Sequence, residues 1–77
     1  MSQAVSENIL KNILKQLEEK SYAYFKNSRL NIRIVKVNIN TPVYLACGEY
    51  YDVSEGWKDF MRVFFDTDTL VWFINSL

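Results

Sequence analysis

The sequence predicts a two-layer α+β domain in which an N-terminal helix packs on an antiparallel β-meander, in the order α-β-β-β-β. Three observations lead to this class: a long amphipathic pattern opens the chain, two strand-like runs flank a Thr-Pro turn, and the last third is rich in aromatic and β-branched residues. An α-β-β-α order with a C-terminal strand or helix is the alternative. The 77 residues form one domain, residues 1–77. A chain of this length buries only roughly 60% of its unfolded surface, and oligomerisation is a common remedy for such a thin core.

The first predicted element is a helix from about Ala4 to Phe25. Its apolar residues recur at the three-and-four spacing that places side chains on one helical face: Ile9, Leu10, Ile13, Leu14, Leu17, Ala23, Tyr24 and Phe25. The opposite face is polar. Ser2 or Ser6 is suited to cap the first turn, and Asn27 is suited to end the helix in a left-handed conformation.

The second element is a strand from Leu30 to Asn40 whose apolar alternation changes parity. Its even-numbered apolar residues are Leu30, Ile32 and Ile34, and its odd-numbered ones are Val35, Val37 and Ile39. Because a strand turns successive side chains to opposite faces, this shift indicates an inserted residue, a sharp bend or apolar residues on both faces. The sequence leaves these three alternatives open.

A hairpin follows, because Thr41-Pro42 favours a turn and proline removes a hydrogen-bond donor from the ladder. The return strand runs over residues 43–51, with Leu45 and Cys47 on the same face. Gly48 either loosens this strand or marks a second bulge. The single Cys47 has no intrachain disulfide partner, and we expect a buried, reduced thiol.

The last third fits two structures. Asp52 and Glu55 have the spacing of a helix-capping box, and the apolar residues that follow suit a helical face. Dense β-branched and aromatic residues instead favour strands over residues 58–65 and 69–75, joined by a loop over residues 66–69. We favour the two strands, because a long helix needs more than a two-stranded hairpin to cover its apolar face.

The composition excludes several classes of function. The chain has no His, one Cys and two Gly, so it lacks the usual general base, the ligands of an ordinary zinc site and the glycines of a phosphate-binding loop. We therefore expect no enzyme activity, no cofactor and no metal, and we interpret Asp66-x-Asp68 as a turn. With no apolar stretch near the roughly 20 residues that span a bilayer and no secretory signal, we expect a cytoplasmic protein without membrane contact.

The aromatic excess in the second half predicts a protein-protein interaction or regulatory module. One helix covers one side of a sheet, so apolar side chains on the other side form a surface that small monomers rarely expose. We expect self-association, as a homodimer, or a protein partner. The predicted partner-binding residues are Phe60, Phe64, Trp72 and Phe73.

Nucleic-acid binding is the alternative function. Residues 1–38 contain seven basic and three acidic residues, whereas residues 39–77 contain two and six. Four of the basic residues lie close together and interleave with Asn and Ser: Lys26, Arg29, Arg33 and Lys36. If a bulge corrected the parity of the first strand, these groups would form one row able to contact phosphates. The pI of about 6.2 speaks against this function. A small-ligand carrier is a third hypothesis.

Overall fold

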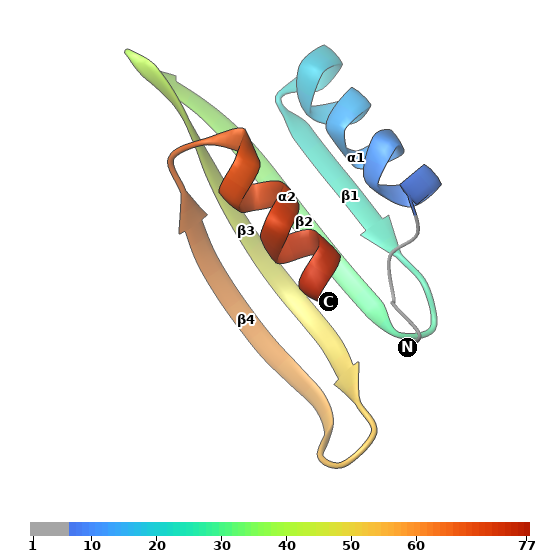
Figure 1. Ribbon diagram of the computed structural model, residues 1–77. Coiled ribbons are helices and arrows are strands. Elements are labelled where there is room, and N and C mark those ends of the chain that lie inside the picture. Colours follow the sequence, from blue (N-terminus) through green and yellow to red (C-terminus); the bar gives the residue numbers. More distant parts are fainter. Residues whose placement is uncertain (1–6) are drawn as a thin grey trace.

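The computed structural model describes residues 7–77 and has two layers, a four-stranded antiparallel sheet and two helices on one of its faces (Figure 1). In chain order the elements are α1 (Glu7–Lys20), β1 (Tyr22–Lys26), β2 (Leu30–Ile39), β3 (Thr41–Asp52), β4 (Gly56–Phe64) and α2 (Thr67–Ser76). The strands lie side by side in the order β1-β2-β3-β4. The α+β class and the helix-on-meander architecture are confirmed. The chain ends in a helix, a possibility that the predicted alternative included. The predicted start near Ala4 and the caps Ser2 and Ser6 lie outside the described residues.

The helix α1 is shorter than predicted, because the segment that follows it is a strand. Ser21 adopts a left-handed φ of 58°, and β1 then pairs with β2 from Tyr22 opposite Val35 to the end of the strand. The prediction of helix through Phe25 was wrong, since edge-strand hydrogen bonds to β2 and burial of one β1 face outweigh the helical spacing. Gln16 of α1 reaches over the strand, where its Oε1 accepts the Tyr24 N–H at 3.2 Å.

The parity change in β2 arises from apolar residues on both faces of the sheet. The register with β3 runs without interruption from Leu30 opposite Tyr50 to Ile39 opposite Thr41, so β2 contains no inserted residue. The even-numbered side chains Leu30, Ile32 and Ile34 are completely or almost completely buried under the helices. The odd-numbered apolar residues consequently project from the opposite face.

Two of the three hairpins of the sheet, β2–β3 and β3–β4, close at residues with positive φ. Asn40, at φ 73°, joins β2 to β3, so the predicted hairpin is confirmed. The turn was predicted one residue too late, because Thr41 and Pro42 already belong to β3 and lie opposite Ile39 and Asn38. At the other end, the Asp52 carboxylate accepts the N–H groups of Ser54 at 2.7 Å and Glu55 at 3.3 Å, and Gly56 follows at φ 82°. The capping-box interpretation of Asp52 was therefore wrong: the same carboxylate chemistry closes a turn instead of starting a helix.

Between these turns, β3 continues through Gly48 without a bulge. Gly48 lies opposite Ile32 on one side and Phe60 on the other, and neither register shifts there. A Cβ atom at this position would lie 1.9 Å from the carbonyl oxygen of Asn31. Glycine therefore allows the close approach of β2 and β3 at the centre of the sheet.

The predicted strand over residues 69–75 was wrong, because this segment forms α2. Asp66 caps the helix: its Oδ1 accepts the Thr69 backbone N–H at 2.8 Å and the Thr69 hydroxyl at 2.7 Å. These hydrogen bonds lower the pKa of the Asp66 carboxyl. A sheet of four strands is wider than one helix, and α2 buries Leu70 and Ile74 in the same core as α1.

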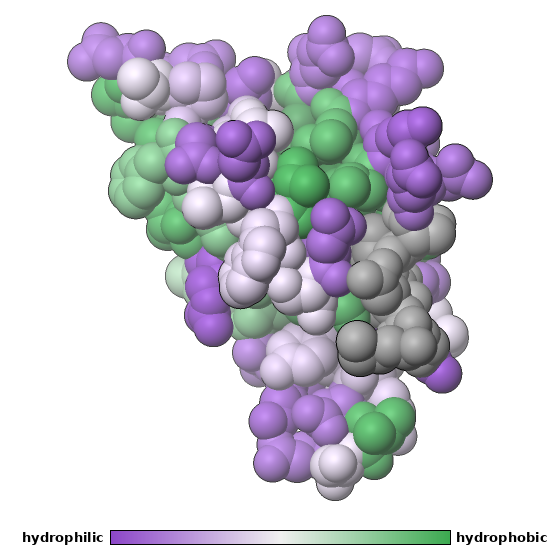
Figure 2. Space-filling view, in the orientation of Figure 1, coloured by the Kyte–Doolittle hydropathy of each residue, from purple (hydrophilic) through white to green (hydrophobic). Residues whose placement is uncertain are grey.

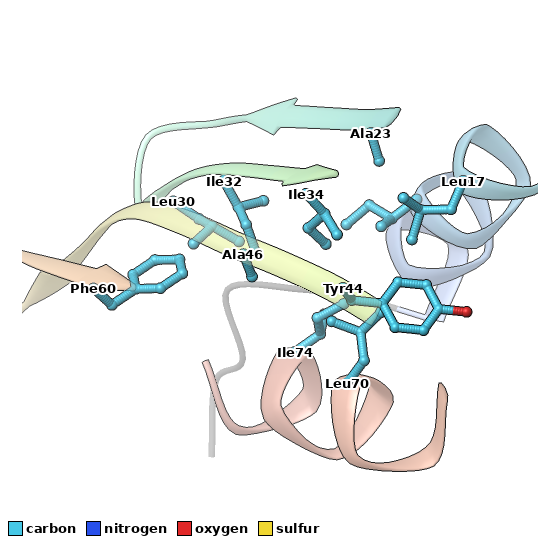
Figure 3. Packing of buried hydrophobic residues seen from close by; sticks show 11 residues of the cluster. Leu17, Ala23, Leu30, Ile32, Ile34, Tyr44, Ala46, Phe60, Leu70 and Ile74 are labelled. Carbon is cyan, nitrogen blue, oxygen red and sulfur yellow. The ribbon is translucent and has the colours of Figure 1, made fainter. Parts of the chain in front are cut away.

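The core lies between the sheet and the two helices, and Figure 3 shows its residues converging from both layers. Its buried members are Ile13, Leu17, Ala23, Leu30, Ile32, Ile34, Tyr44, Ala46, Phe60, Leu70 and Ile74. The Tyr44 hydroxyl lies 3.0 Å from Thr67 Oγ1 and so ties β3 to the start of α2. Seen from the helix side, hydrophilic residues cover the outer surface of α1 and hydrophobic residues lie between the two helices (Figure 2). Neither helix of residues 7–77 is long and apolar enough to cross a membrane.

Candidate interaction surface

The sheet face that points away from the helices carries no covering element among residues 7–77, and we call it the open face (Figure 1). Residues directly opposite each other in an antiparallel register share a face, so the pairings define its members. It consists of Tyr22, Tyr24, Lys26, Asn31, Arg33, Val35, Val37, Ile39, Thr41, Val43, Leu45, Cys47, Glu49, Tyr51, Trp57, Asp59, Met61 and Val63.

The centre of the open face is apolar. One row of register partners crosses all four strands, Tyr22, Val35, Leu45 and Val63, and each of the four exposes between 41% and 48% of its surface. Met61, in the next row, is 74% exposed. Nine of the twelve large apolar residues that are exposed among residues 7–77 belong to the open face. The parity change in β2 therefore produces a broad apolar surface and not a set of scattered side chains.

A polar row borders this apolar centre. Lys26, Asn31, Glu49 and Asp59 lie opposite one another across the four strands. The basic end of the row is on β1 and its acidic end is on β3 and β4. Asn31 Oδ1 is buried and accepts no hydrogen bond from the residues described. Beyond the row, the rings of Tyr51 and Trp57 meet edge to face, with centroids 5.7 Å apart.

The apolar centre is also slightly hollow. A depression of about 450 Å³ lies on it, and Val35, Leu45, Met61 and Val63 are among its lining residues. Arg33 and Arg62 also contribute to its lining. An apolar concavity with a few charged groups in its lining is suited to receive an apolar side of another protein.

The four predicted partner-binding residues lie on the other side of the molecule. Phe60 is buried, and Phe73 of α2 packs against it and against Phe64, with ring centroids 5.4 Å and 5.2 Å apart. Trp72 is the exposed member at 71%. Phe60, Trp72 and Phe73 line a groove of about 630 Å³ between α2 and the β3–β4 hairpin. The structure thus gathers the four residues under and around α2, and binding of a partner there stays a prediction.

The four predicted nucleic-acid-binding residues do not form one row. Lys26 and Arg33 are on the open face, and Arg29 lies in the turn between β1 and β2. Lys36 pairs with Tyr44, a core residue, and so occupies the opposite face. Because β2 contains no bulge, the condition that would have aligned these groups is not met.

Cys47 is exposed, and the expectation of a buried thiol was wrong. Its position in β3 was predicted correctly, on the face of Leu45, but that face is the open one. The residues described contain no group of three or more His, Cys, Asp or Glu side chains able to hold a metal ion. The arrangement of the open face suits binding through apolar contact and charge.

The residues at the centre of this surface were only partly identified from the sequence. The parity change in β2 would have identified Val35 and Leu45 if β2 and β3 had been assumed to pair without a bulge, because the two residues then lie opposite each other on the uncovered face. Three comparisons, with models of protein families, with curated proteins and with solved structures, find no match to the chain.

Proposed function

We propose that this protein is a small, non-catalytic interaction module, of the regulatory or adaptor kind, that self-associates as a homodimer through the open face. The observation that supports this proposal is the apolar centre of the face, formed by Tyr22, Val35, Leu45, Met61 and Val63. Small soluble monomers rarely expose a contiguous apolar surface larger than a few hundred Å². The opposite face of the same sheet is already covered by α1 and α2.

The size of the surface is adequate for a stable contact. At about 200 Å² for a large side chain in the open, nine side chains that are about half exposed present on the order of 900 Å² per subunit. A standard stable interface buries roughly 800 Å² per partner. The exposed apolar area of one open face is therefore about as large as the area that a stable dimer buries on each subunit.

Leu45→Lys tests the proposal, because Leu45 lies at the centre of the face and is 44% exposed. We expect the wild-type protein to sediment as two chains at micromolar concentration and the variant as one. Placing an ammonium group in a desolvated apolar contact opposes association, whereas in the free subunit the long side chain reaches water. Sedimentation velocity and multi-angle light scattering measure the mass.

Val53→Lys is the matched control, because Val53 is an exposed apolar residue of the β3–β4 turn outside the open face. It should sediment as two chains. Far-UV circular dichroism verifies the fold of each variant, and Met61→Lys replaces Leu45→Lys if the latter fails to fold. A wild-type protein that stays monomeric at its highest soluble concentration contradicts the proposal, and so does a dimer unaffected by both open-face variants.

A further inference from the structure

The charges of the open face are separated across the strands. Lys26 on β1 and Arg33 on β2 occupy one side, whereas Glu49 on β3 and Asp59 on β4 occupy the other. Neither Lys26 nor Asp59 forms an ion pair with another residue of 7–77. Since β1 and β4 are three strand spacings apart, about 14 Å, these two side chains do not reach each other within one subunit. Each face therefore offers a basic side and an acidic side to whatever covers it.

We propose that two copies pack open face to open face around a two-fold axis that runs along the strands, between β2 and β3. This inference rests on the proposed self-association and specifies its geometry. The rotation places β1 over β4 of the second copy and β2 over β3 of the second copy. Lys26 then faces Asp59 of the second copy, and Asn31 faces Glu49 of the second copy. By symmetry each contact occurs twice.

The same rotation matches the apolar rows. Val35 meets Leu45 of the second copy, and Tyr22 meets Val63 of the second copy. All four side chains belong to one row of register partners, so the apolar centre is covered by an apolar centre. The strand directions of the two sheets stay close to aligned, as in the common β-sandwich packing. The product is a four-layer assembly with both sheets inside and the helices outside.

A two-fold axis perpendicular to the strands would not pair the charges. That rotation places each strand over the same strand of the second copy, so Lys26 lies over β1 and Asp59 over β4 of the second copy, and neither meets an opposite charge of the open face. Like charges across an interface disfavour association, whereas opposite charges favour it and set the orientation. The charge distribution thus selects the axis that runs along the strands.

Two charge reversals test this arrangement. Lys26→Glu alone, or Asp59→Lys alone, places like charges opposite each other twice in the dimer, and we expect the dissociation constant of each variant to rise about tenfold or more. An equimolar mixture of the two variants should form a heterodimer with nearly wild-type affinity, because both contacts then join opposite charges. Native mass spectrometry distinguishes the heterodimer from the two homodimers by mass.

The matched controls are Lys15→Glu and Glu19→Lys, which make the same charge changes at exposed positions of α1. Neither should weaken the dimer, and their mixture should form heterodimers only in the statistical proportion. If the open-face variants dimerise like these controls, or if their mixture shows no preference for the heterodimer, the proposed axis is wrong. In that case a monomeric Leu45→Lys variant would still support self-association through the open face, so the proposed function does not depend on the proposed axis. A monomeric wild-type protein overturns both proposals.

Discussion

Gly48→Ala tests the account of the sheet, because Gly48 lies in a central part of β3 with a strand on either side. A Cβ atom added there would lie 1.9 Å from the Asn31 carbonyl oxygen, 2.9 Å from the Asn31 carbonyl carbon and 3.0 Å from Ile32 Cα. All three are backbone atoms of β2, so no side-chain rotation relieves the overlap. The φ of +153° at Gly48 is also a conformation that other residues rarely adopt.

The cost of this substitution follows from the overlap. A carbon atom and a carbonyl oxygen approach to about 3.3 Å without repulsion, so β2 and β3 have to separate locally by more than 1 Å. Overpacking of this kind costs about 1–3 kcal/mol, and each ladder hydrogen bond that the separation weakens contributes about 1 kcal/mol. We therefore expect a loss of about 2–4 kcal/mol. A chain of 77 residues has a total stability of roughly 4–12 kcal/mol.

Gly56→Ala is the matched control, because a Cβ atom there has nothing within 4 Å and only the φ of +82° opposes it. Its cost is that of a left-handed residue, about 1–2 kcal/mol. Urea denaturation followed by far-UV circular dichroism measures both losses. We expect Gly48→Ala to lose at least twice as much stability as Gly56→Ala, or not to fold. Equal or smaller destabilisation by Gly48→Ala would refute the close approach of β2 and β3.

Two further predictions concern neighbouring faces and the cap of α2. Ile34→Ala should lower the free energy of unfolding by about 2–5 kcal/mol because the side chain is completely buried. Val35→Ala, made in the monomeric Leu45→Lys background, should lower it by less than about 1 kcal/mol. Similar losses for the two variants in urea denaturation would mean that the two sheet faces are wrongly assigned. Asp66→Ala should lower the melting temperature more than Asp66→Asn, since asparagine still accepts the Thr69 N–H. Because the folded-state pKa of Asp66 is lowered, its carboxylate stabilises the fold above its unfolded pKa of about 3.9 and loses this effect as the pH falls through the folded value. The melting-temperature difference between wild type and Asp66→Asn should therefore shrink in acid, and a constant difference would contradict this role.

The C-terminal segment shows where sequence reasoning reached its limit. Leu70 and Ile74 fit a helical face, and the aromatic residues around them fit a strand equally well. The preference for a strand followed from an assumed two-stranded hairpin under one long helix. Once Tyr22–Lys26 forms a strand, the sheet is complete without this segment, and the wider sheet needs a second helix as cover.

The sequence pattern also did not determine which apolar residues of the sheet lie on the uncovered face. The expectation that one side of the sheet would stay uncovered came from counting apolar residues on both faces of the strands. Phe60 and Phe64 lie on the helix side of β4, and the pattern of one strand does not say which face the helices occupy. The register of β4 with β3, together with the position of α2, places Met61 and Val63 outside instead.

The amino-acid sequence by itself determined the local features of this protein: an amphipathic N-terminal helix, a hairpin near Thr41-Pro42, and a strand with apolar residues of both parities. These depend on periodicity and turn chemistry, which act between residues close together in the chain. Only the tertiary structure decided that Tyr22–Lys26 is a strand, that the C-terminus is a helix, and which sheet face is open. Those outcomes depend on hydrogen bonds and burial between distant segments, and these contacts outweigh a local preference worth only a fraction of a kcal/mol per residue.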